Sequence, residues 1–471
     1  MPSTDAVGAA SGGGLSVLPL FISVLLIPAA LGSSLMIFND GDVSWHVASG
    51  RWILAHRMLP TTDPFSFTWS GKPWVAMEWL ADVIYAIGYN LRGYSGLAAL
   101  VTAAMMALSA IVFTNANRWG RYALLVVLAM DLVLIPMTFA RPHVLVWPIV
   151  ALWTMLLMRA RASGRAPPLW TALLMILWSN LHASFVVGLF IAAAFGLEGL
   201  VASTDRARAF RDWLIFGLVC AVAVCINGNG IHGVLYPLSY TDLKMLPLID
   251  EWKPSRPGVT PFFFGVLVLT LGLIAWKRPR LHPVRWILLA ALLLAAMLQA
   301  RHQATLAIVA AMMLPAGFAR GEGQRHPISP SLGWVTAGAA ALLVAVRAVA
   351  PLQPPENEAN PWHLIGQVPP QLRSQPVLNG YSMGGPLILS GIRPYIDGRS
   401  DMYGDPLVLG YVRIVHGDAG AFAAAVQRWN IRWAIVPNKG GLIALLDRSP
   451  GWRRISRDNV GAIYVREASR V

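Results

Sequence analysis

Cysteines and charged side chains are both scarce in this chain of 471 residues. The two cysteines, Cys220 and Cys225, lie in one apolar run, so neither a disulfide framework nor a metal site built from thiolates is indicated. Charged residues make up 13% of the sequence and hydrophobic residues 56%. A soluble globular protein of this length needs far more charge on its surface, so that class is excluded.

Long apolar runs recur along the sequence and predict a mainly α polytopic membrane bundle. The net charge of +14 comes from short basic clusters between these runs. Such clusters orient membrane helices, so the basic balance does not indicate a nucleic-acid partner. The sequence predicts about 11 spans, near residues 15–38, 95–113, 122–140, 144–160, 168–181, 183–201, 213–228, 260–276, 285–300, 303–319 and 332–350.

The basic clusters also predict the orientation of the chain. They contain Arg118 and Arg121; Arg159, Arg161 and Arg165; Arg206, Arg208 and Arg211; Lys277, Arg278, Arg280 and Arg285; and Arg320 and Arg325. With these clusters in the cytoplasm, the N-terminus lies inside and the C-terminus outside. The N-terminus has no basic segment and no clear cleavage site, so we expect the first helix to be retained.

The first outer loop, about residues 39–94, follows the first apolar run. Asp40 and Asp42 come where that run ends, which places their carboxylates at the membrane surface within reach of water. If Asp42–Trp52 is helical, Asp42 and His46 share one face. An ordinary juxtamembrane helix with capping residues is the alternative. Residues 79–89 are expected to form a surface helix in this loop, with a twelfth crossing as the alternative.

Most other polar side chains of interest are predicted on the same outer side. They are Glu78, Arg141, His143, Asn180, His182, Asn227, Asn229, His232, Glu251, Arg301 and His302. Each has a local explanation, such as a snorkelling arginine or turn chemistry. Ionisable groups at the ends of membrane helices are costly unless they line a cavity, so their gathering on one side indicates a site.

The character of the sequence changes near Pro351. Residues 1–350 are assigned to the membrane domain, 351–376 to a linker, and 377–471 to a small α/β domain outside the membrane. Its predicted strands lie in QPVLNGY, RPYIDGRSDMY, IRWAIVPN, WRRISR and AIYVRE, and its predicted helices in AFAAAVQRW and GLIALLDRS. The glycines of GYSMGGPL fit a turn better than a phosphate loop. Asp397, Arg399, Asp401 and Tyr403 either face the membrane site or form a structural ion-pair cluster.

Several short motifs resemble a known superfamily. They are D-x-x-W-H at Asp42–His46, P-W-x-x-x-E-W-L ending at Leu80, R-P-H at Arg141, W-x-N-L-H at Trp178–His182, D-E-W at Asp250–Trp252 and D-G-R-S-D-M-Y-G from Asp397. Together they resemble bacterial multi-pass proteins of the GT-C glycosyltransferase superfamily, which includes the protein O-mannosyltransferases and aminoarabinose transferases. In this chain Gly41 separates two acids that are adjacent in the common pattern.

The resemblance implies a hexosyl or pentosyl transferase of the bacterial inner membrane. It implies a polyprenyl-phosphate sugar donor, an extracytoplasmic glycan, lipid or protein acceptor, and an aspartate of the first outer loop near the reacting atoms. By position that aspartate is Asp40 or Asp42, and we favour Asp42. The C-terminal domain would then be periplasmic.

The chemistry of this transfer suits the residue types on the outer side. A carboxylate removes the acceptor proton, while Arg141 and Arg301 hold the departing phosphate. Further candidate substrate ligands are His46, Glu78, His143, Asn180, His182, Glu251 and His302. Alternatively, Asp40, Asp42 and His46 hold a divalent cation, Mg²⁺ or Mn²⁺.

Two other classes of protein stay open. A scaffold for envelope polysaccharide assembly accounts for the appended outer domain. A transporter accounts for polar residues at helix ends, but transporters usually show repeats and polar breaks near the middle of the membrane, which this sequence lacks.

Overall fold

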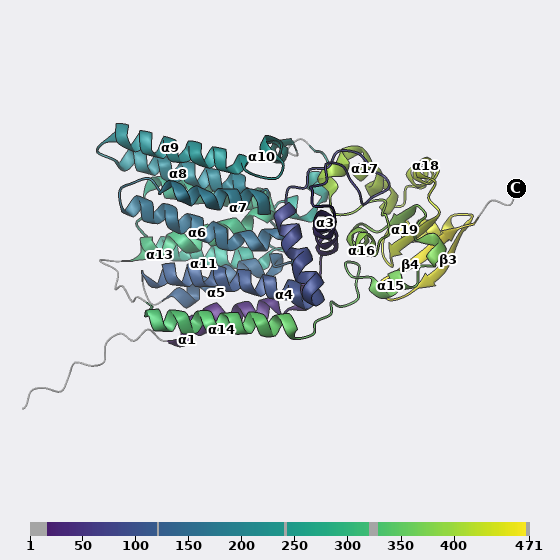
Figure 1. Cartoon of the computed structure of the whole chain (residues 1–471), viewed down its shortest axis with the longest axis horizontal. Helices are drawn as coiled ribbons and strands as arrows, with labels where there is room; N and C mark the ends of the chain where they lie inside the picture. Colours follow the sequence, from purple (N-terminus) through teal and green to yellow (C-terminus); the bar gives the residue numbers. More distant parts are fainter. Residues whose placement is uncertain (1–16, 120–121, 240–242, 320–327, 468–471) are drawn as a thin grey trace, which may run out of the picture.

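The computed structural model describes residues 17–119, 122–239, 243–319 and 328–467. A helical bundle carries a small domain with a sheet at one of its ends, and α3 lies between the two (Figure 1). The predicted combination of a mainly helical chain with a small C-terminal sheet is confirmed. The bundle contains α1 (Val17–Phe21), a π-helical turn (Ile22–Leu26), α2 (Ile27–Gly32), α3 (Asp42–His56), α4 (Trp79–Asn117), α5 (Ala123–Leu134), α6 (Pro142–Ala162), α7 (Leu173–Leu181), α8 (Phe185–Ala202), α9 (Arg206–Cys225), α10 (Gly230–Ser239), α11 (Pro261–Lys277), α12 (Pro283–Leu298), α13 (Gln303–Phe318) and α14 (Pro330–Val349).

Every predicted span overlaps a helix of the bundle, but the count of 11 crossings is not confirmed. By length and composition, four of the described helices are able to cross a membrane, or up to five if the bent pair α9 and α10 is one crossing. Several others are apolar but shorter, among them α11 and α12. The chain is therefore a membrane protein by the length and composition of its helices.

The basic clusters lie at the end of the bundle opposite the C-terminal domain. The turn between α8 and α9, which precedes Arg206, is at the far left of Figure 1. Arg159 and Arg161 occupy the last turn of α6, about 30 Å from its start at a rise of 1.5 Å per residue. Arg121, Arg320 and Arg325, together with the first 16 residues, lie outside the part of the chain that is described.

Helix α4 contains a kink that divides it into two segments. The backbone leaves helical geometry at Arg92 and Gly93, where Gly93 has φ of 58°, a value that favours glycine. Beyond the kink, the Cβ of any larger residue at Gly96 would lie 2.0 Å from the carbonyl oxygen of Gly88, so the two segments pack closely. Residues 79–89, predicted as a surface helix, form the segment ahead of this kink, next to α3 (Figure 1).

The C-terminal domain is built on a four-stranded sheet in the order β1-β2-β4-β3. Strands β1 and β2 are parallel, and the other neighbouring pairs are antiparallel. Its elements are α15 (Trp362–Gly366), β1 (Val377–Asn379), α16 (Gly384–Leu389), α17 (Ser400–Val415), α18 (Ala419–Trp429), β2 (Trp433–Pro437), α19 (Gly441–Arg448), β3 (Trp452–Arg457) and β4 (Gly461–Arg466). Leu364 and Ile365, which the sequence assigns to the linker, pack in the core beside Trp433.

One predicted strand is wrong. The segment RPYIDGRSDMY forms an irregular turn that leads into α17, with no strand. Its backbone bonds the side chain of Asn379 instead of a neighbouring strand: Asn379 accepts from the amide of Tyr395 at 2.8 Å and donates to the carbonyl of Ile396 at 2.8 Å. An asparagine amide offers the same donor and acceptor as a peptide group, so these two bonds replace the backbone hydrogen bonds that a neighbouring strand would make.

Candidate active site

The site begins where the first helical hairpin turns at the end of the bundle. The Oδ1 atom of Asp40 accepts a hydrogen bond from the amide of Asp42 at 2.9 Å, which satisfies a free N–H at the start of α3. Arg141 precedes Pro142, the first residue of α6, and its backbone is extended, as a residue before proline prefers. Tyr85 of α4 donates to the carbonyl of Arg141 at 2.8 Å and so fixes this corner.

Three carboxylates gather around the Arg141 guanidinium. Its Nη1 lies 3.0 Å from Oδ2 of Asp40, and its Nη2 lies 3.1 Å from Oδ2 of Asp42. Glu251, from a 3-10 turn at residues 250–252, also pairs with Nη1. One positive charge therefore faces three acids, and the cluster favours retention of a proton or the approach of a further cation.

Asp42 has a pKa suited to proton transfer near neutral pH. Burial and the neighbouring charge of Asp40 together raise its pKa to about 7, whereas Arg141 acts in the opposite direction. The pKa of Glu251 is lowered, chiefly by Arg141. The acids of the cluster are thus not equivalent, and Asp42 is the one poised to exchange a proton.

A second polar chain lies beside this cluster. The Nδ1 atom of His46 is 2.7 Å from Oδ1 of Asp82, and Ser49 donates to the other oxygen of Asp82 at 2.6 Å. Glu78 approaches Nε2 of His46 at 3.7 Å and Nε2 of His182 at 3.2 Å. These contacts join α3, the start of α4 and the end of α7 through the buried His46, Ser49 and Asp82 and the half-buried Glu78 and His182.

His46 therefore points toward Asp82 and Glu78. The sequence had suggested Asp42 as its partner instead. Burial lowers the pKa values of His46 and His182, so both rings are neutral at pH 7. Burial, with the charge of Asp82, raises the pKa of Glu78 to about 8. A protonated Glu78 is able to donate to either imidazole. Sequence reasoning missed Asp82, although Glu78 and Asp82 are four residues apart and so share a helical face.

The remaining candidates differ in how closely they approach this centre. His143 bonds the carbonyl of Met137 at 2.9 Å, with its ring centre 6.3 Å from that of His182. The guanidinium of Arg301 lies 4.3 Å from the ring centre of Trp252, and its charge acts on Glu78, Glu251 and His182. Burial and the charge of Arg301 lower the pKa of His302 to about 4.

Asn180 and the asparagines after α9 form hydrogen bonds with neighbouring parts of the bundle. The Oδ1 atom of Asn180 accepts from the indole of Trp79 at 2.7 Å and from the amide of Gly228 at 3.2 Å, while its Nδ2 donates to the carbonyls of Ile176 and Ile226. Asn227 bonds within its own turn, and Asn229 donates to the carbonyl of Ala76 at 3.1 Å. His232 is exposed on α10.

The C-terminal domain packs directly on the carboxylates. The Cβ of any larger residue at Gly398 would lie 1.6 Å from Oδ1 of Asp42, and at Gly385 it would lie 2.0 Å from the carbonyl oxygen of Gly41. Asn360 donates to the carbonyl of Phe38 at 2.7 Å. The glycines of GYSMGGPL and IDGRSD thus permit close contact between the two domains.

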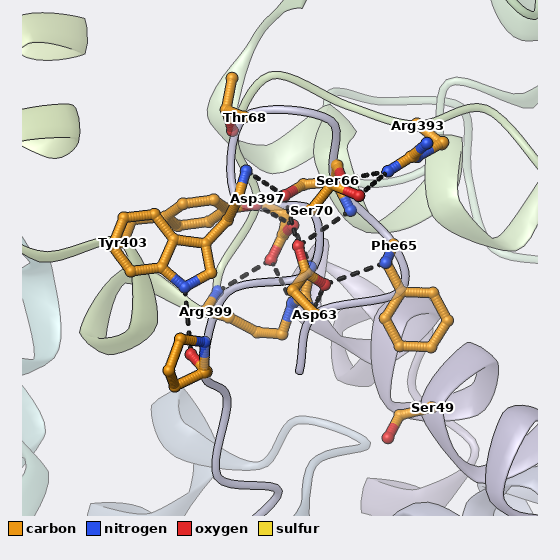
Figure 2. Close-up of polar contacts among 12 residues, drawn as sticks. Ser49, Asp63, Phe65, Ser66, Thr68, Ser70, Arg393, Asp397, Arg399 and Tyr403 are labelled. Carbon is orange, nitrogen blue, oxygen red and sulfur yellow. Dashed lines mark hydrogen bonds and ion pairs between the residues drawn. The ribbon is translucent and has the colours of Figure 1, made fainter. Parts of the chain in front are cut away.

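Figure 2 shows the junction between the first outer loop and the C-terminal domain. Arg399 pairs with Asp63 of the loop and with Asp397, both at 2.7 Å, and Tyr403 donates to Asp397 at 2.5 Å. All four side chains are buried. Arg399 and Asp397 thus form a structural ion-pair cluster, while Asp401 accepts from Tyr236 at 2.9 Å. The sequence did not predict the ion pair between Asp63 and Arg399.

The predicted site for Mg²⁺ or Mn²⁺ consists of Asp40, Asp42 and His46. Within the described residues, no three His, Cys, Asp or Glu side chains are grouped so as to hold a metal ion. Arg141 stands between Asp40 and Asp42 where a cation would neutralise both, and His46 bonds Asp82. Asp40, Asp42 and His46 are therefore not arranged to hold one cation together.

An apolar groove opens on the side of the bundle near Trp79 and Asn180. Its volume is about 490 Å³, and α7 and the end of α9 form its walls. Leu173 and Leu177 of this lining are 63% and 40% exposed, which places apolar surface where lipid would lie. Trp79 of this lining directly follows Glu78 in the sequence, and Asn180 precedes His182 by two residues.

Comparison with known proteins gives similarity to solved structures only at the level of the fold. No family model and no curated protein matches the sequence. Among solved structures, the chain is similar to the oligosaccharyltransferase of Archaeoglobus fulgidus in its apo form, with 10% identity and a TM-score of 0.49 over 88% of this chain and 69% of that one. A similarity of this degree assigns no activity to the chain.

Proposed function

We propose that this protein is a membrane glycosyltransferase of the GT-C type. It moves a hexosyl or pentosyl group from a polyprenyl-phosphate donor to a hydroxyl or amine of an extracytoplasmic acceptor. The observation that carries the proposal is the cluster of Asp40, Asp42 and Glu251 around Arg141 at one end of a bundle of apolar helices. Three of the six sequence motifs that resemble the superfamily contain Asp42, Arg141 or Glu251.

The transfer is a direct displacement. The acceptor oxygen or nitrogen attacks the anomeric carbon as the bond from that carbon to the phosphate oxygen breaks. The electron pair of the broken bond leaves with the lipid phosphate, and the acceptor proton passes to the carboxylate of Asp42. Attack from the face opposite the phosphate inverts the anomeric configuration. A positioned base of this kind typically contributes about a hundred- to ten-thousandfold in rate.

Arg141 and Arg301 supply the positive charge for the phosphate. Arg141 is shared among three carboxylates, so in the absence of donor it also keeps Asp42 in place. Arg301 lies at the same end of the bundle, with its guanidinium on Trp252. Charge-assisted hydrogen bonds from guanidinium to phosphate are strong and directional, which stabilises the leaving group as its charge develops.

The apolar groove beside Trp79 suits the polyprenyl chain of the donor. Its exposed leucines face the region that lipid occupies, and Trp79 of its lining is the neighbour in sequence of Glu78. A lipid lying in this groove brings its phosphate to the end of the bundle that carries the acids. The basic clusters at the opposite end favour the cytoplasm for that side, so the reaction takes place at the periplasmic face of the bacterial inner membrane.

The proposal is tested by adding the purified full-length protein, in lipid nanodiscs, to membranes from cells that lack it. The donors are undecaprenyl phosphates that carry radiolabelled hexoses or pentoses, and the assay follows label as it leaves the lipid fraction. We expect the protein to consume at least one donor, to release undecaprenyl phosphate, and to retain this activity in EDTA. The double variant Asp40→Asn/Asp42→Asn is the matched control. If the parental protein consumes no donor, the transferase is excluded and a scaffold role takes its place.

A further inference from the structure

A second groove lies between the first outer loop and the C-terminal domain, away from the apolar groove. It has a volume of about 510 Å³. The loop contributes Trp69 and Lys72, and the C-terminal domain contributes residues of α17, α18 and the segment before them. Neither the carboxylate cluster nor the proposed donor site uses these residues.

Four aromatic residues line this groove, the half-buried Trp69 and Trp429 and the buried Tyr395 and Tyr403. Trp69 and Tyr403 meet edge to face with ring centres 6.2 Å apart, and Tyr395 and Trp429 do so at 6.5 Å. Small residues also line the groove, including Gly404, Gly410, Ala421, Ala424 and Ala425. Aromatic rings beside small side chains accept flat ligands with apolar C–H faces, and sugar rings have this shape.

The charge of the groove is positive. Lys72, Arg413 and Arg428 line it, and no acidic residue does. Arg413 pairs with Asp418 at 2.6 Å. Lys72 and Arg428 instead lie over the rings of Trp69 and Trp429, at 4.3 and 5.1 Å from the ring centres, and neither pairs with a carboxylate in the described part of the chain. Both are exposed, so a bound anion reaches them without displacing an ion pair.

We propose that this groove binds an acidic oligosaccharide, with sugar rings packed between Trp69 and Trp429 and a carboxylate or phosphate on Lys72 and Arg428. An arginine offers a carboxylate two parallel N–H donors, and an aromatic ring beside it excludes water from one side of the pair. Aromatic walls without cations would favour neutral sugars, and cations without rings would favour small anions. The two features together select a sugar that carries charge.

The groove is connected to the carboxylate cluster through one short segment. Tyr403 lines the groove and donates to Asp397, and the next residue, Gly398, packs against Asp42. An oligosaccharide held in the groove therefore lies next to the segment that covers the carboxylates. The oligosaccharide would be the acceptor only if the proposed function holds. Its binding to the groove does not depend on that function.

Binding is measured by calorimetry on the full-length protein in nanodiscs. The probes are tetramers of galacturonate, mannuronate and hyaluronan, each compared with the neutral maltotetraose. We expect at least one acidic tetramer to bind at least tenfold more tightly than the neutral one, and its affinity to fall as salt is added because screening weakens charge pairs.

The variant Lys72→Gln/Arg428→Gln should weaken binding of the acidic tetramer at least tenfold. Arg453→Gln, at an exposed arginine of β3, is the matched control and should bind like the parent. Failure of every acidic tetramer to bind, equal affinity for the neutral one, or full affinity in the double variant would each overturn the proposal. If the acidic tetramer binds but the donor assay shows no sugar transfer, the transferase function is excluded and the oligosaccharide-binding site still stands.

Discussion

The Nη2 atom of Arg141 lies 3.1 Å from Oδ2 of Asp42, which joins the start of α6 to the start of α3. Arg141 also pairs with Asp40, and the negative charge of Asp40 opposes the effect of Arg141 on the pKa of Asp42. Burial adds to the effect of Asp40, and the pKa of Asp42 comes to about 7. The geometry thus holds one carboxylate in place while leaving it able to take up a proton.

The orientation of the chain gives a first prediction. Cysteines introduced at Ser70 and Gln427, in a background without Cys220 and Cys225, should react with a membrane-impermeant maleimide in spheroplasts. A cysteine at Ala162, at the end of α6 near Arg161, is the control and should react only after permeabilisation. Labelling of Ala162 together with protection of the other two positions would reverse the orientation.

The junction between the domains gives a second prediction. Arg399→Met leaves Asp63 and Asp397 buried without their counterion, and breaking a buried pair of this kind costs about 3–5 kcal/mol. We expect a lower melting temperature in detergent and faster proteolysis between the domains. Arg453→Met, at an exposed pair with Glu467, should change stability by about 0–1 kcal/mol. Equal melting temperatures for the two variants would rule out a structural role for the junction.

Asp82 gives a third prediction. It accepts from Ser49 and bonds His46, so Asp82→Ala leaves two buried polar groups without a partner, at about 1–3 kcal/mol each. Asp82→Asn keeps one acceptor oxygen and should be closer to the parent in stability, yet should lower kcat more than it changes KM because His46 loses its fixed orientation. Parental kcat in the asparagine variant would limit Asp82 to a role in packing.

The pKa of Asp42 sets the expected pH dependence. A base acts in its ionised form, so kcat/KM should rise with pH and level off above about 7, the pKa of Asp42. Removing the charge of Asp40 lowers the pKa of Asp42, since that charge raises it. The Asp40→Asn profile should therefore shift to lower pH. A flat profile between about pH 5 and 9 would contradict the assignment of Asp42 as the base.

The helical segments and the gathering of polar residues at one end of the bundle follow from sequence, because apolar length and basic clusters are local signals. Strand assignment failed at RPYIDGRSDMY because the side chain of Asn379, a distant residue, bonds the backbone of that segment. The partner of His46 also depends on tertiary packing: α3 places its ring against Asp82 of α4 rather than against Asp42.

The contacts of Arg141 depend on three segments far apart in the sequence. Asp40, Asp42 and Glu251 reach it from the first hairpin and from a turn after α10, and no spacing within the sequence indicates this meeting. Asp63 is similar, since its partner Arg399 belongs to the other domain. Sequence indicates which residue types gather at the outer end, and packing decides which of them bond one another.

The most direct test of the account compares Asp42→Asn with Asp40→Asn in the sugar-transfer assay at pH 8. Asparagine keeps the size of the side chain and removes its basicity, so Asp42→Asn should bind donor normally and lower kcat by about a hundredfold or more. The ionised form of Asp42 is disfavoured by folding, so this variant should also melt no lower than the parent above pH 7. Asp40→Asn should lose less activity. Transfer by Asp42→Asn at the parental rate would contradict the account and remove Asp42 from the reaction.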